Sequence, residues 1–143
     1  MKIAVRPQDC AYIVKKEDRK IICIYHPPRN IVSQYIMNLC PFIMFYMFET
    51  DCGEVELKSY YRGIAVCAEG DEWDEEFGKL VAFNKMRERY YTAVYKRINN
   101  FFNWADESLN RAANQFDYMG DKWGKSIDQT EKLIKKHFEN KEP

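Results

Sequence analysis

Residues 63–85 have the sequence GIAVCAEGDEWDEEFGKLVAFNK. The stretch begins with small and β-branched apolar residues, which are typical of a buried strand. It then passes through a turn that contains Gly70 and a run of carboxylates, and it ends in a segment with helical spacing. We therefore predict a join at this point, with a sheet before it and a helix after it.

The first quarter of the chain has the pattern of antiparallel strands. Met1–Val5 is predicted as a short edge strand that Pro7 terminates. Two apolar runs, Ala11–Val14 and Ile21–Tyr25, flank a charged turn at residues 15–20, and this spacing predicts a β-hairpin.

A short helix and further strands are predicted between the hairpin and the join. Residues 29–39 place apolar side chains on one helical face: these are Ile31, Val32, Tyr35, Ile36 and Leu39. The aromatic run 42–48 and the alternating segment 54–58 are each predicted as a strand, and the sheet resumes at residues 64–67. Gly63 is interpreted as a bulge or kink.

From Asp71 onward the apolar residues follow a helical period. The predicted stripe consists of Leu80, Phe83, Val94, Ile98, Phe101, Ala105, Leu109, Ala112, Phe116, Met119, Trp123, Ile127, Ile134 and Phe138. One helix over this span would be about 100 Å long at 1.5 Å per residue. We therefore expect breaks, first at Gly120-Asp121 and second at Asn103 or Asp106.

The resulting fold class is α+β. An antiparallel sheet with one short helix, in the order β-β-α-β-β, precedes a long helical C-terminal half. At 143 residues the chain is predicted to form a single domain, residues 1–143, with a sheet-rich part at 1–68 and a helical part at 69–143.

Charge and cysteine content narrow the class of protein. Lys+Arg and Asp+Glu are equal at 22 each, which disfavours a dedicated duplex-DNA binder. The five cysteines form an odd set without a CxxC pair or a signal peptide, so we expect free thiols in a cytoplasmic protein. No apolar run reaches the roughly 20 residues of a transmembrane helix, and no membrane partner is expected.

The acidic run after the join is the first candidate binding surface. Asp71 is predicted to cap the helix, because an aspartate oxygen accepts hydrogen bonds from the free amides of the first turn. Asp74, Glu75 and Glu76 either favour the helix dipole or form a docking surface for a basic partner. A metal site would need more converging oxygens, and none is expected.

A second candidate surface combines cations with tyrosines. Arg87 falls within the apolar stripe, with Tyr90 and Arg97 at its border and Tyr91 beside it. Such residues either form structural pairs or contact a phosphate and a base. The chain has no Gly-rich phosphate loop, nucleophile motif or paired metal-ligand motif, so neither an enzyme nor a cofactor is expected.

The join also resembles small uncharacterised proteins of phages and prophages of Gram-positive bacteria. The resemblance covers about residues 62–90 and consists of the Ala-x-Cys strand end at 65–67, the acidic turn Asp71-Glu-Trp-Asp74, and Gly78 followed by Ala82. Trp73 replaces the phenylalanine of that pattern, and Ala68 replaces its usual proline. The resemblance implies a phage origin and carries no reaction.

Three functions follow as hypotheses. The first is a phage-encoded inhibitor that binds a host defence protein or ribonucleoprotein, such as a CRISPR-Cas complex, in the cytoplasm of the host bacterium. The second is a module that binds nucleic acid or sequesters a signalling nucleotide through Arg87, Tyr90, Tyr91 and Arg97. The third is a structural homo-oligomer joined through the C-terminal helices. Across the three hypotheses we expect either a monomer or a homodimer.

Overall fold

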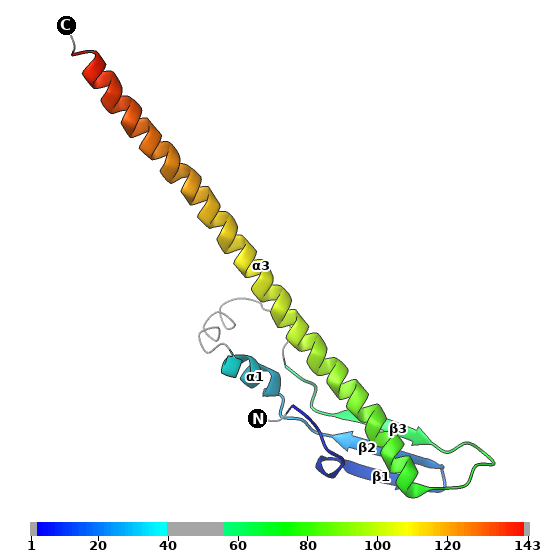
Figure 1. Ribbon diagram of the computed structural model, residues 1–143. Coiled ribbons are helices and arrows are strands. Elements are labelled where there is room, and N and C mark those ends of the chain that lie inside the picture. The colour runs from blue at the N-terminus through cyan, green and yellow to red at the C-terminus, as the bar shows by residue number, and fades with distance from the viewer. Residues whose placement is uncertain (1–2, 40–55, 142–143) are drawn as a thin grey trace. The chain divides into compact units, whose positions relative to one another are not determined.

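The computed structural model describes residues 3–39 and 56–141, and it confirms an α+β fold. Its elements are η1 (Pro7–Asp9), β1 (Ala11–Lys15), β2 (Lys20–Tyr25), α1 (Ile31–Leu39), β3 (Tyr61–Val66) and α3 (Glu75–Glu139). The three described strands form one antiparallel sheet in the order β1-β2-β3 (Figure 1). The chain divides into two compact units, Met1–Asn103 and Trp104–Pro143.

The division between the units lies within α3, whereas the predicted change from sheet to helix lies between residues 68 and 69. The single domain over residues 1–143 stays a prediction. The two units are therefore described separately.

The hairpin and the short helix confirm the sequence prediction. In β1 and β2, Tyr12 pairs with Cys23 and Val14 pairs with Ile21. In α1, Ile31, Val32 and Ile36 are buried, and Tyr35 is exposed at the edge. The predicted strand at 42–48, together with Cys40 and Cys52, lies outside the described residues.

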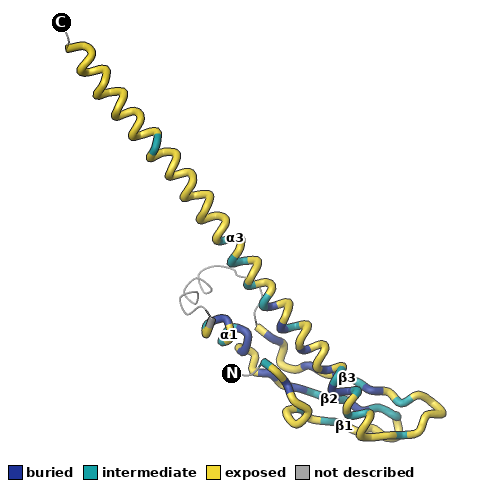
Figure 2. The backbone as a smooth tube through the Cα atoms, viewed as in Figure 1, coloured by how far each residue is buried: buried dark blue, intermediate teal, exposed yellow. Residues whose placement is uncertain are grey.

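One face of the sheet and the first part of α3 enclose the core of the first unit (Figure 2). The core residues alternate along β2 and β3 and recur every three or four positions along α3, as each period requires. They are Ile21, Cys23, Tyr25, Tyr61 and Ala65 from the sheet, Ile31, Val32 and Ile36 from α1, and Ala82, Phe83, Met86, Tyr90 and Val94 from α3. Val5 and Leu57, which lie outside these elements, complete the core. Ile98 and Phe101 pack partly buried against this cluster.

Gly63 brings β3 and α3 together, and the predicted bulge is wrong. The pairing of β2 with β3 continues without interruption from Lys20–Val66 to Tyr25–Tyr61, and Gly63 pairs with Cys23. A Cβ atom at Gly63 would lie closer than 3.0 Å to the backbone of Ala82 and Met86. The glycine is needed because the helix backbone occupies the space that a side chain would take.

Two predicted strands are wrong in their described parts, because residues outside the sheet bind their backbone. Residues 3–5 are not a strand. Instead, the Tyr90 hydroxyl donates to the carbonyl of Ile3 at 2.8 Å, and the Val5 amide donates to the Tyr91 hydroxyl at 3.3 Å. These bonds satisfy backbone groups that a strand would have paired within a sheet.

Residues 56–58 likewise lack strand structure. The Leu57 amide donates to the carbonyl of Arg29 at 3.1 Å, and Arg29 Nε donates to the Leu57 carbonyl at 3.2 Å. Leu57 is buried. The alternation of polar and apolar residues in the sequence therefore identified correctly that Leu57 faces the core.

The predicted breaks in the C-terminal helix are wrong. Within the described residues α3 runs from Glu75 to Glu139, through Asn103 and Asp106 as well as Gly120 and Gly124. A glycine inside a helix costs about 1 kcal/mol but keeps its amide donor. No proline occurs in this span, so no residue removes a helical hydrogen bond.

Replacing Gly63 by alanine is expected to lower the free energy of unfolding by about 3 kcal/mol or more, because rigid backbone on α3 cannot move aside as a side chain would. Gly124→Ala is the control: a Cβ there meets nothing within 4 Å, and alanine favours a helix by about 1 kcal/mol. Thermal melting followed by circular dichroism measures both. A Gly63→Ala protein that melts like the parent would contradict the close packing of β3 on α3.

Candidate functional site

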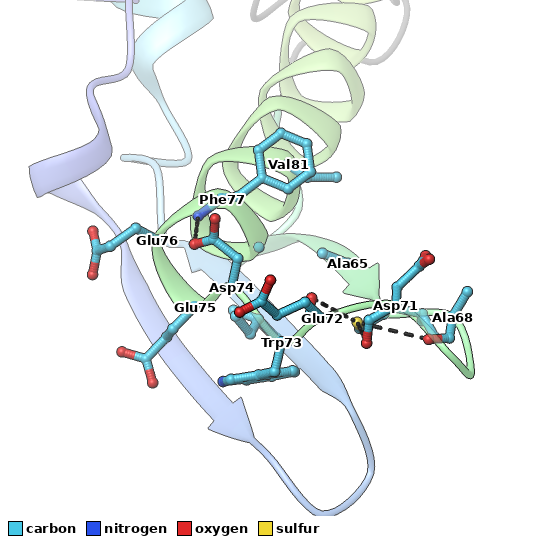
Figure 3. A pocket seen from close by; sticks show the side chains of 14 residues that line it. Ala65, Ala68, Asp71, Glu72, Trp73, Asp74, Glu75, Glu76, Phe77 and Val81 are labelled. Atoms are coloured by element: carbon cyan, nitrogen blue, oxygen red, sulfur yellow. Dashed lines mark hydrogen bonds between the residues drawn. The ribbon is translucent and has the colours of Figure 1, made fainter.

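The acidic turn between β3 and α3 lines a groove of about 850 Å³ (Figure 3). Its walls combine carboxylates with apolar side chains, among them Trp73, Phe77 and Val81. Gly70 has a φ of 88°, a left-handed conformation that favours glycine, and it turns the chain at the tip of this loop. The groove is thus lined by both carboxylates and apolar side chains.

Arg19 binds this turn, and its role there was not predicted from the sequence. Its guanidinium donates to the Cys67 sulfur at 3.0 Å, to the Ala68 carbonyl at 3.1 Å and to the Asp71 carbonyl. Arg19 itself has a φ of 53° at the end of the β1–β2 turn. An arginine in a hairpin turn is normally a solvated residue, so no local pattern indicated that it binds a loop 48 residues away.

The helix begins three residues later than predicted, with Asp74 and not Asp71 as its cap. α3 starts at Glu75, and the Asp74 carboxylate accepts the Phe77 amide at 3.1 Å, as the dashed line in Figure 3 shows. This is the bond between an N-cap oxygen and the third amide of a helix. Asp71 lies in the preceding turn, where its backbone carbonyl binds Arg19.

Glu75 and Glu76 occupy the first turn of α3, where carboxylates favour the helix dipole. Both also pair with Lys79, at 3.3 Å and 3.9 Å between nitrogen and oxygen. Glu76 is largely exposed in its pair, and such surface pairs contribute little to stability. A structural role is therefore present for all three predicted acidic residues, and their docking role stays a prediction.

Arg87 and Tyr91 lie at the surface of α3. The Arg87 guanidinium lies 5.3 Å from the centre of the Phe83 ring and donates to the Asn84 side chain at 2.8 Å. Its long side chain thus covers a core phenylalanine while its charge stays in water. Tyr91 is partly exposed and binds the N-terminal segment through the Val5 amide.

Tyr90 and Arg97 belong to the interior of the first unit. Tyr90 has no exposed surface and packs edge-on against Tyr25 with ring centres 5.0 Å apart. Burial raises the pKa of its hydroxyl above the ordinary tyrosine range. Arg97 is buried and donates to the carbonyls of Glu56 at 2.7 Å and Ala93 at 3.1 Å. Base stacking on Tyr90 would require opening the core.

Cys10, Cys23 and Cys67 are free thiols, as predicted for them. Burial raises the pKa of the Cys10 thiol to about 12, which keeps it protonated and weakly nucleophilic at neutral pH. His26 is exposed and contacts the Ser59 carbonyl at 3.2 Å. Among residues 3–39 and 56–141, no three His, Cys, Asp or Glu side chains converge as metal ligands would.

The helix of the second unit has an exposed apolar face. Beyond Asn103, α3 is exposed along nearly its whole described length (Figure 2). We name as the association stripe the exposed large residues Leu109, Phe116, Met119, Trp123, Ile127, Ile134 and Phe138. Phe116 is 79% exposed and Trp123 is 70% exposed. The sequence predicted these residues on one face, and the structure shows that nothing within the unit covers them.

The stripe follows the period of a straight helix. Its residues recur at intervals of three, four or seven, which keeps them within one face at about 3.6 residues per turn. The opposite face carries Arg111, Tyr118 and Lys125. In soluble monomers large exposed apolar surfaces mark sites of interaction. The stripe is therefore the strongest candidate site of the described chain.

Comparisons with known proteins name no family for this site. The chain matches no family model, no curated protein sequence and no solved structure. Within the described residues, no helix has an apolar stretch long enough to cross a lipid bilayer.

Replacing Asp74 by alanine is expected to lower the free energy of unfolding by about 0.5–2 kcal/mol, because the Phe77 amide loses its acceptor. Asp71→Ala is the matched control and should change stability little, since the carbonyl that binds Arg19 remains in alanine. Urea unfolding of both variants measures the difference. Equal losses, or a larger loss for Asp71→Ala, would contradict the observed cap.

Proposed function

We propose that this protein acts by binding another protein through the association stripe, without catalysing a reaction. The observation that carries the proposal is the exposure of aromatic and aliphatic side chains along one face of residues 109–138. A helix with one unpacked apolar face gains most of its stability from packing against a partner. The function that fits such a face is association with a complementary helix or groove.

The chemistry of the stripe suits a protein partner. Aromatic residues and methionine are enriched in the cores of interfaces, and Phe116, Met119 and Trp123 lie in the middle of the stripe. Burying one large apolar side chain contributes about 1.5–3 kcal/mol. The seven residues of the stripe together contribute a free energy of the same order as the roughly 4–15 kcal/mol that association costs.

Host defence machinery remains the partner class that the phage resemblance implies. The acidic groove is the second candidate surface, because Trp73 and Phe77 lie beside Glu72, Glu75 and Glu76 and would suit a basic, partly apolar segment. Nucleotide binding receives less support, since Tyr90 and Arg97 are buried and bind backbone carbonyls. One experiment separates these surfaces.

The test compares three variants of the tagged full chain in a pull-down. The stripe variant carries Phe116→Ser, Trp123→Ser and Ile127→Ser, and the acidic variant carries Glu72→Gln, Glu75→Gln and Glu76→Gln. The control carries three serines on the opposite face: Arg111→Ser, Tyr118→Ser and Lys125→Ser. The preparation contains Gram-positive bacterial lysate and an untagged copy of the chain, with and without nuclease.

We expect the stripe variant to capture at least tenfold less protein than the parent captures, because each substitution removes a large apolar contact. The control and acidic variants should capture as the parent does, and nuclease should have no effect. Capture that survives the stripe substitutions would overturn the proposal. Loss in the acidic variant alone would assign binding to the groove, and loss on nuclease treatment would assign it to nucleic acid.

A further inference from the structure

We infer that the partner of the association stripe is a second copy of this chain, with the two stripes packed antiparallel about a point between Asp121 and Lys122. The inference rests on the proposed function and names its partner. Two independent features of the second unit support it: the reversal of charge along the helix and the placement of its apolar residues about one midpoint.

The sign of the charge changes halfway along the second unit. Residues 104–121 contain four carboxylates and one arginine, a net charge of −3. Residues 122–141 contain six lysines and three carboxylates, a net charge of +3. Two copies that run in the same direction place like charges side by side along both halves. Two copies in opposite directions place each acidic half beside a basic half, which favours that orientation.

Each residue of the association stripe falls opposite an apolar residue or a glycine when two copies pair about the same midpoint. Residues at equal distances on either side of the point between Asp121 and Lys122 come opposite each other in an antiparallel pair. The pairs are Phe116 with Ile127, Leu109 with Ile134, Ala105 with Phe138, and Gly120 with Trp123. Four stripe residues thus meet one another, while Met119, Trp123 and Phe138 meet Gly124, Gly120 and Ala105.

Gly120 and Trp123 form the contact nearest the midpoint. A Cβ atom at Gly120 would meet nothing of its own chain within 4 Å, so the space above this glycine is open. Trp123 is 70% exposed and lies on the same face one turn away. In the antiparallel pair each indole covers the glycine of the other copy, and this contact occurs twice. The fit of a large residue over a small one defines the register.

The first measurement is the mass of the full chain by sedimentation equilibrium. We expect twice the chain mass of 17.1 kDa for the parent, and the mass of one chain for the Phe116→Ser, Trp123→Ser, Ile127→Ser variant. A parent of one chain mass at concentrations where it captures a host protein would overturn self-association. It would leave the proposed function intact, so the two failures are distinguishable. If the parent is a monomer and binds anionic vesicles, the stripe would be assigned to a lipid surface instead.

The second measurement is the distance between spin labels on the two copies. A ketone-bearing residue in place of Lys136 takes the label, which leaves the native thiols unlabelled. The antiparallel pair predicts about 45 Å between the two labels, from 1.5 Å per residue. A parallel pair predicts less than about 30 Å, because packed helix axes lie about 8–10 Å apart.

A label in place of Lys122, beside the midpoint, is the control for the distance measurement. It should give a short distance in either orientation and thereby show that the dimer is labelled and observed. A long distance at 136 with a short distance at 122 supports the inference. A short distance at both positions overturns the antiparallel orientation, and a long distance at 122 overturns the register.

Discussion

The close approach of β3 to α3 at Gly63 is the constraint on which the first unit depends. Because Gly63 has no side chain, the backbone of Ala82 and Met86 lies directly on the sheet. The same approach recurs at Gly78, where a Cβ would lie 2.6 Å from the Ile21 side chain. With the helix this close, Met86 and Tyr90 are fully buried. α3 packs against one face of the sheet.

The polar side chains of α3 complete the same packing. Several of them donate hydrogen bonds to backbone carbonyls of segments that lack regular structure or belong to β3: Lys85 to Ile64, Arg89 to Arg62, Tyr90 to Ile3 and Arg97 to Glu56. The carbonyls of Ile3 and Glu56 are partly buried and need such partners because no strand pairs with them. Of the residues that suggested a phosphate site in the sequence, Tyr90, Tyr91 and Arg97 hold other segments against the helix, whereas Arg87 contacts only its own helix.

Periodicity carried most of what the sequence could predict. The hairpin, α1, β3 and the helical half all follow from the spacing of apolar residues, as does the face that bears the association stripe. The errors concern partners that are distant in the chain. Residues 3–5 and Glu56 are bound by helix side chains, Leu57 is bound by Arg29, and Arg19 binds the turn after β3. No local pattern encodes such contacts.

The predicted start of α3 and its predicted break at Gly120 were wrong for different physical reasons. Asp71 and Asp74 are equally good caps by residue type, and only the position of the turn held by Arg19 selects Asp74. Gly120 disfavours a helix by about 1 kcal/mol, too little to end one by itself. Spacing identified the stripe as apolar, but it could not show that the second unit leaves the stripe uncovered.

A partner on the association stripe stabilises the helix of the second unit, whereas the helix of the first unit packs against its own sheet. Amide hydrogen exchange of the full chain tests this claim most directly, with the parent compared to the serine variants of the stripe and of the opposite face. We expect faster exchange across residues 104–139 in the stripe variant only, with residues 82–97 unchanged, because an unpacked helix is marginally stable. Equal exchange in the parent and both variants would contradict it.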